Sequence, residues 1–226
     1  DRRQRQMCIR DRSYMDAEFW QSRWDAREIG FHQEQGNPLL KAHFSQLALS
    51  AGDRVFIPLC GKTKDIAWLL ANNYRVVGAE LSEIAIKELF AELGVTAQVK
   101  PVGKLLHYSA TNIDIYLGDI FELSAEVLQS VDAIYDRAAL VALPFVMRCK
   151  YTQHLNDISQ LAPQLVICFE YDQSVHDGPP FSVTEKELRE HYGSNYMISL
   201  VGRVVLDGGL KGRVAADEAV WVLNAK

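Results

Sequence analysis

The sequence predicts an α/β fold in which a mostly parallel sheet of seven strands is covered by helices on both faces. Between residues 54 and 169, short apolar runs alternate with amphipathic stretches of helical length, which is the pattern of a parallel sheet with crossover helices. After residue 196, two long β-rich runs follow each other with only a turn between them. This ending predicts an antiparallel hairpin at one edge of the sheet.

The first fourteen residues differ in composition from the rest of the chain. Residues 1–14 hold five arginines and two aspartates, a charge of +3, which leaves −8 on residues 15–226. They show no apolar period, so we expect a disordered or non-native leader, a native start at Met15 and a single domain over residues 15–226. A basic arm for anionic partners is the alternative interpretation.

Residues 16–49 predict two helices that form an N-terminal helical cap. The first helix carries three aromatic residues, Phe19, Trp20 and Trp24, and the second covers residues 38–49. Aromatic residues at helical spacing usually pack in a core. The face of an aromatic ring is also suited to a sulfonium cation, so Trp24 is a candidate ligand contact.

The remaining elements follow in order. Seven β-rich runs give the strands, at residues 54–57, 75–80, 113–117, 133–135, 164–169, 196–206 and 218–223. Four more helices are expected at residues 63–72, 82–93, 144–161 and 184–191. The Asp207-Gly208-Gly209 break provides the turn of the last hairpin. This antiparallel ending is typical of a Rossmann-like methyltransferase fold, whereas nicotinamide-binding Rossmann domains are usually parallel throughout.

Composition argues against several classes of protein. The net charge of −5 and the lack of a basic stripe disfavour a nucleic-acid partner, and no apolar run approaches the roughly 20 residues that span a bilayer. The four cysteines and six histidines show no metal-ligand spacing, so we expect no metal. A reduced, cytoplasmic monomer that acts on a small molecule, with no membrane partner, is the resulting prediction.

The loop Pro58-Leu59-Cys60-Gly61 follows the first predicted strand, where ligands of open α/β sheets bind. A nicotinamide cofactor would need G-x-G-x-x-G at this point, but the loop contains only Gly61. A pyrophosphate is therefore excluded as the ligand of this loop, and a ligand without phosphate fits it better. An ordinary strand-to-helix turn is the alternative.

Three charged residues follow the next strands. Glu80 ends the second strand, where a carboxylate can bind a ribose diol; it could instead be a favourable charge at the start of the next helix. Asp119 follows the third strand and could accept from an adenine amino group or only cap a turn. Arg137 follows the fourth strand and could bind a carboxylate or stack on a ring; a buried Asp136–Arg137 pair is the alternative.

Six blocks of sequence together resemble one family. They are Phe19-Trp20 with Trp24, the run from Phe31 to Gly36, the run from Arg54 to Lys62, Val77-Gly78-x-Glu80-Leu81-Ser82, Asp136 to Ala142, and His176-x-Gly178-Pro179-Pro180-Phe181. In this order and at these intervals the chain resembles the bacterial thiopurine S-methyltransferases, from about Met15 to its C-terminus.

The resemblance implies S-adenosyl-L-methionine as cofactor and S-adenosyl-L-homocysteine as product. It implies cofactor contacts from Trp24, Leu59, Glu80 and Arg137, with Asp119 and Ile120 near the adenine and a close approach at Gly61. Phe31, Arg137, Pro180 and Phe181 are the expected acceptor contacts. The family has a second arginine near its C-terminal end; here either Lys211 or Arg213 could take its place.

The reaction implied is in-line methyl transfer to an aromatic or heterocyclic thiol such as a thiopurine, with Arg137 as the catalytic residue that stabilises the anionic acceptor. Three alternatives stay open. The same fold could methylate small inorganic nucleophiles, such as selenium or tellurium species or halide. A nicotinamide oxidoreductase is disfavoured by the missing glycine motif, and a non-catalytic binding domain is disfavoured by Trp24, Glu80, Asp119 and Arg137 occurring together.

Overall fold

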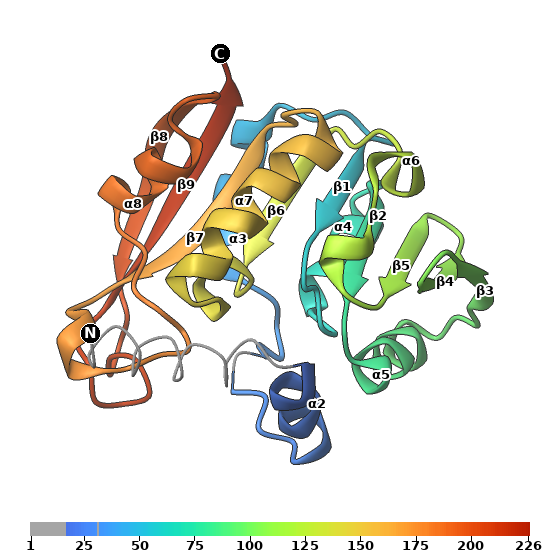
Figure 1. Cartoon of the computed structure of the whole chain (residues 1–226), viewed down its shortest axis with the longest axis horizontal. Helices are drawn as coiled ribbons and strands as arrows, with labels where there is room; N and C mark the ends of the chain where they lie inside the picture. Colours follow the sequence, from blue (N-terminus) through green and yellow to red (C-terminus); the bar gives the residue numbers. More distant parts are fainter. Residues whose placement is uncertain (1–16, 31) are drawn as a thin grey trace.

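The computed structural model of the chain describes residues 17–30 and 32–226. Its centre is one nine-stranded sheet with the strand order β3-β4-β5-β2-β1-β6-β7-β9-β8 (Figure 1). The five central strands, from β5 to β7 in this order, are parallel, and the outer strands are joined to them by antiparallel pairing. The strand order reverses between β1 and β6, so the loops that leave these two strands diverge and open a crevice.

All seven predicted strands are present. They are β1 (Arg54–Ile57), β2 (Arg75–Glu80), β5 (Ile113–Leu117), β6 (Ala133–Arg137), β7 (Gln164–Glu170), β8 (Tyr196–Val205) and β9 (Asp217–Ala225). The count of seven was too low, because an additional hairpin, β3 (Gln98–Val102) and β4 (Leu105–Ala110), extends the sheet beyond β5. β3 lies at the sheet edge with most of its residues exposed, so it lacks the apolar run by which the other strands were predicted.

Helices cover both faces of the sheet, as predicted. They are α4 (Lys64–Ala71), α5 (Glu83–Leu93), α6 (Ala125–Leu128), α7 (Phe145–Ser159) and α8 (Glu185–Tyr192). Successive residues of a strand point to opposite faces, so Phe56 packs with α6, α7 and α8, while Val55 and Ile57 pack with α4 and α5. Each central strand thus contributes to two hydrophobic cores, which explains why these strands are continuous apolar runs.

The two N-terminal helices have different positions. α2 (Ala17–Asp25) lies below the strand ends, apart from the sheet (Figure 1). α3 (Pro38–His43) instead buries Leu39 and Leu40 in the core on the α4 and α5 side. The predicted helical cap is therefore a single helix, because the apolar side chains of the second helix are drawn into the main core.

Polar side chains fix the helix starts near the strand ends. Thr63 accepts from the backbone N–H of Asp65 at the start of α4, and Ser82 accepts from that of Ala85 in α5. None of the helices in the described part of the chain is long and apolar enough to cross a membrane.

Candidate active site

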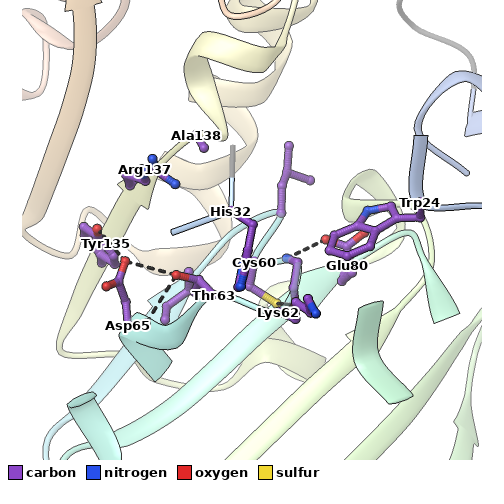
Figure 2. Close-up of a pocket in the computed structure, with 13 residues that line it drawn as sticks. Trp24, His32, Cys60, Lys62, Thr63, Asp65, Glu80, Tyr135, Arg137 and Ala138 are labelled. Atoms are coloured by element: carbon purple, nitrogen blue, oxygen red, sulfur yellow. Dashed lines mark hydrogen bonds between the residues drawn. The ribbon is translucent and has the colours of Figure 1, made fainter. Parts of the chain in front are cut away.

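Two adjoining cavities lie at the carboxyl ends of the central strands. The first, of about 60 Å³, lies between the exits of β1 and β6 and is drawn in Figure 2. The second, of about 180 Å³, lies on the side of β5 and is bordered by α7. Leu59 and Glu80 line both cavities, so the two form one continuous site on either side of these residues.

The loop after β1 has an unusual backbone. Leu59 and Gly61 have φ angles of +48° and +53°, and the N–H of Cys60 donates to the carbonyl of Ala79 at 3.0 Å. A positive φ is costly for leucine, and such backbone strain is concentrated at functional sites. Burial raises the pKa of the Cys60 thiol well above its ordinary value, so Cys60 stays protonated and is not a nucleophile.

Glu80 is a buried carboxylate that receives three backbone hydrogen bonds. One oxygen, Oε1, accepts from the N–H groups of Leu81 and Ser82, both at 2.8 Å. The other oxygen, Oε2, accepts from the N–H of Gly61 at 2.7 Å (Figure 2). Burial raises the pKa of Glu80, while the three N–H groups oppose this shift.

Both interpretations of Glu80 find support in this geometry. Its bonds to Leu81 and Ser82 hold the start of α5, as expected of a charge at a helix N-terminus. A carboxylate has about four acceptor positions, so one position on Oε2 is available to a ligand. Glu80 therefore links the β1 loop, the start of α5 and the wall of both cavities.

The second cavity contains the residues predicted to lie near a purine. Asp119 and Ile120 line it together with Phe121, and Trp20 reaches it from α2. Asp119 also caps a short 3-10 helix, Ile120–Glu122, by accepting from the N–H of Phe121 at 3.0 Å. Its turn-capping role is therefore present, and its exposed carboxylate still borders the cavity.

Arg137 ends β6 and lines the first cavity, next to Ala138 with its left-handed φ of +62°. Its neighbour Asp136 points to the opposite face of the sheet, where it accepts from the hydroxyl of Tyr151 at 2.7 Å and the N–H of Leu140 at 3.0 Å. Burial raises the pKa of Asp136 to about 6. Asp136 thus holds the β6 loop from the α7 side of the sheet, and Arg137 is directed toward the cavity.

Several residues of the first cavity were not predicted as site residues, among them His32, Thr63, Asp65 and Tyr135. The buried Asp65 carboxylate accepts from the Tyr135 hydroxyl at 3.0 Å, the Thr63 hydroxyl at 3.1 Å and the backbone N–H of Asn37 at 2.6 Å. It therefore fastens the segment that follows α2 to the strand exits. These partners are up to 70 positions apart in sequence, so no local pattern indicated them.

Among the described residues, Arg137 is the one acceptor contact expected from the resemblance that lines a cavity. Phe31 lies outside the described residues. Pro180 and Phe181 are absent from the described walls of both cavities; the Phe181 ring instead lies 5.4 Å from the guanidinium of Arg148. Lys211 donates to the carbonyl of Pro179 at 3.1 Å, while Arg213 is exposed.

From α2, Trp24 is buried and lines the first cavity, where its indole faces the strand-exit residues (Figure 2). Core packing and a ligand contact are therefore compatible at this position.

In the described ranges, no group of three or more histidine, cysteine, aspartate or glutamate side chains is arranged to hold a metal ion.

The chain was compared with known protein families and structures. It matches the family described as Thiopurine S-methyltransferase (TPMT) over residues 15–226. The thiopurine S-methyltransferase of Xanthobacter autotrophicus is 51% identical over 211 residues, which cover 93% of this chain and 99% of that protein.

Two solved structures show the same fold at 16% sequence identity. A SAM-dependent methyltransferase from Anabaena variabilis has a TM-score of 0.66, over 93% of this chain and 95% of that one. The 1,6-didemethyltoxoflavin-N1-methyltransferase of Burkholderia thailandensis, solved with bound S-adenosylhomocysteine, has a TM-score of 0.62, over 94% and 88%. The resemblance and the fold are thus confirmed: this chain is a member of the thiopurine S-methyltransferase family with a Rossmann-like methyltransferase fold.

Proposed function

We propose that this protein transfers a methyl group from S-adenosyl-L-methionine to the sulfur of an aromatic or heterocyclic thiol, with thiopurines as the substrate class. The observation that carries the proposal is the continuous site on both sides of Glu80, in a chain of the thiopurine S-methyltransferase family. The product would be S-adenosyl-L-homocysteine.

The residues of the site suit this cofactor. The larger cavity, lined by Ile120, Phe121 and the exposed Asp119 carboxylate, fits an adenine ring and its amino group. The remaining acceptor position of Glu80 fits a ribose hydroxyl, and the polar first cavity fits the amino-acid end. S-adenosyl-L-methionine contains no phosphate, so the Leu59 loop does not need a phosphate-binding motif.

When bound, the cofactor supplies a methyl group activated by an adjacent sulfonium centre. The protein must then orient a thiolate opposite the leaving sulfur and exclude water, because alignment in a dry, preorganised site lowers the barrier. Trp24, which is 3% exposed, shields the first cavity and presents an aromatic face suited to a cation. Arg137 would hold the anionic acceptor from the β6 side.

Lys211 is the better candidate for the second basic acceptor contact. Its ammonium lies against the carbonyl of Pro179, and its pKa is lowered by burial and by the charge of Arg23 on α2. Lys211 and Arg213 are both exposed, but in the described part of the chain only the Lys211 ammonium bonds to the Pro179 loop. Two cations near the acceptor would favour a thiolate over a neutral thiol.

Calorimetric titration with S-adenosylmethionine, S-adenosylhomocysteine and NAD tests the cofactor. We expect S-adenosylmethionine and S-adenosylhomocysteine to bind and NAD not to bind; the opposite result would contradict the proposed cofactor.

Turnover on 6-mercaptopurine tests Arg137. We expect Arg137→Ala, which removes the positive charge at the acceptor, to lose about a hundredfold in kcat/KM. Arg137→Lys, which keeps the charge, should recover part of this loss. Near wild-type rates for both variants would exclude the role of Arg137.

Methylation of selenium or tellurium species or of halide is the less favoured alternative, and the same assay with these nucleophiles distinguishes it.

We further propose a cytoplasmic monomer that acts on small molecules and not on nucleic acid or membranes. The net charge of −5 supports the choice of partner, because it would repel a polyanion. Arg137, Trp24 and Glu80 at one continuous site likewise favour an enzyme over a non-catalytic binding domain.

A further inference from the structure

His32 occupies a central position in the first cavity. It lies in the segment between α2 and α3, and Figure 2 shows its side chain between the Asp65 group and the loop after β1. The side chain is only 7% exposed. Nothing in the reaction described above uses this residue.

The Nε2 atom of His32 is buried without a hydrogen-bond partner among the described residues. The nearest carboxylate oxygen, on Glu34, is 3.7 Å away, which is too long for a hydrogen bond. A buried polar atom without a partner is costly in free energy, and native structures rarely leave one unsatisfied. Because His32 also lines the first cavity, its Nε2 is available to a ligand there.

Two charged side chains of the same cavity wall, Asp65 and Lys62, already have partners. The Asp65 carboxylate accepts from Tyr135, Thr63 and the backbone of Asn37. The Lys62 ammonium is 2.9 Å from the Glu88 carboxylate and 2.8 Å from that of Glu92. Among the described residues that line the first cavity, His32 Nε2 is the one buried side-chain polar atom without a hydrogen-bond partner.

His32 is neutral at neutral pH. Burial and the positive charge of Lys62 lower its pKa below 6.5, while the Glu34 carboxylate opposes this shift. A neutral imidazole carries one donor and one acceptor nitrogen, and the tautomer decides which. Nε2 can therefore donate to a carboxylate or accept from an ammonium group, without a charge of its own to be neutralised.

We propose that His32 is a binding residue for the α-amino-acid end of the cofactor, which hydrogen-bonds Nε2; this inference rests on the proposed function. If the adenine lies in the second cavity and the ribose at Glu80, the opposite end of an adenosyl thioether extends into the first cavity. There the ammonium and carboxylate groups of that end meet the unpaired nitrogen. His32 thereby positions the cofactor without touching the atoms that react.

Two ligands separate this role from a structural one. S-Adenosylhomocysteine carries the amino-acid end, and 5′-methylthioadenosine lacks it but keeps the adenosine and the sulfur. We expect His32→Ala to weaken S-adenosylhomocysteine binding by at least about tenfold, the loss of one hydrogen bond to a charged group. Methylthioadenosine should bind to wild type and variant within about twofold of each other, because it makes no such bond.

Two further variants complete the calorimetric experiment. His32→Gln keeps a polar group near Nε2 and should recover most of the S-adenosylhomocysteine affinity. His43→Ala, at the end of α3 and against β8, is the matched control and should change neither affinity. Equal weakening of both ligands by His32→Ala, or weakening of neither, would overturn the proposal. If wild type bound neither ligand, the proposed function itself would fail, and that result is distinct from either of these.

Discussion

At the scale of single residues, Glu80 has both a structural and a binding role, and an isosteric variant separates them. Glu80→Gln keeps Oε1 for the Leu81 and Ser82 N–H groups but directs an amide N–H₂ toward Gly61, or the reverse. The first orientation removes the acceptor position left for a ribose hydroxyl; the reverse orientation keeps it but sets the amide N–H₂ against two backbone N–H donors instead of one, so the first is favoured. We expect S-adenosylhomocysteine to bind about tenfold more weakly by calorimetry.

Glu83→Gln is the matched control, because Glu83 begins α5 one turn away and bonds to Lys87 and Tyr108 outside the cavities. It should leave the affinity unchanged. An unaltered affinity in Glu80→Gln would mean that Glu80 serves only the helix start.

Asp136 predicts a pH dependence of stability. Its pKa rises from 3.8 to about 6 on folding, so between these pH values the folded state binds more protons than the unfolded state. Stability contributed by this group therefore falls as pH rises from about 4 to about 6 and is level above that. Asp136→Asn should remove this fall, and the variant should gain up to about 3 kcal/mol relative to wild type between pH 4 and pH 7.

Urea unfolding at several pH values measures this difference. Asp172→Asn is the control of opposite sign, because hydrogen bonds from Ser174 lower the pKa of Asp172 and its contribution is lost as pH falls. A constant difference between wild type and Asp136→Asn across this pH range would contradict the prediction.

At the scale of elements, α2 lines the site while the sheet forms the hydrophobic core. One tryptophan in each allows the two roles to be measured separately. Trp24 comes from α2 and lines the first cavity, while Trp221 lies in β9 within the main core. We expect Trp24→Ala to weaken S-adenosylhomocysteine binding by about tenfold or more, because a wall of the site is removed. Trp221→Ala should instead reduce the free energy of unfolding by about 3–5 kcal/mol.

Thermal denaturation and calorimetry on the same samples decide between the two effects. Trp24→Phe, which keeps an aromatic face, should recover part of the affinity. A loss of stability in Trp24→Ala equal to that in Trp221→Ala would show that α2 belongs to the core.

The elements also show what a sequence can predict. β1, β2 and β7 are buried on both faces, so each reads as a continuous apolar run that cannot be mistaken for a loop. The β3–β4 hairpin is held by pairing along the edge of β5, with polar residues and Pro101 in its outer strand, and it carries no such signal.

The same distinction holds within the site. Leu59, Glu80, Asp119 and Arg137 line the cavities, and each was predicted at a position that ends a strand or follows it within two residues. The carboxyl ends of parallel strands meet at one edge of the sheet. Asp65 lies inside α4, and its role depends on Tyr135, which is brought to it only by the folded sheet. Long-range hydrogen bonds of this kind leave no periodic pattern.

At the scale of the whole molecule, residues 15–226 are proposed to contain the complete methyltransferase domain, in agreement with the extent of the family match. A variant that begins at Met15 should keep the S-adenosylhomocysteine affinity within about twofold and the free energy of unfolding within about 0.5 kcal/mol, because the sequence of residues 1–14 shows no apolar period. Light scattering should give the mass of one chain for both forms. A large loss of affinity would instead assign residues 1–14 to the site.

Leu59 combines opposite demands at one position. Its left-handed backbone, with φ at +48°, is a conformation that glycine adopts without a steric penalty, whereas its side chain packs against the main core. The side chain also forms part of the wall of both cavities. Glycine at residue 59 would relieve this strain but would remove both the core contact and the wall that Leu59 gives to the two cavities. Backbone relaxation and the shape of the site therefore favour different residues at this position.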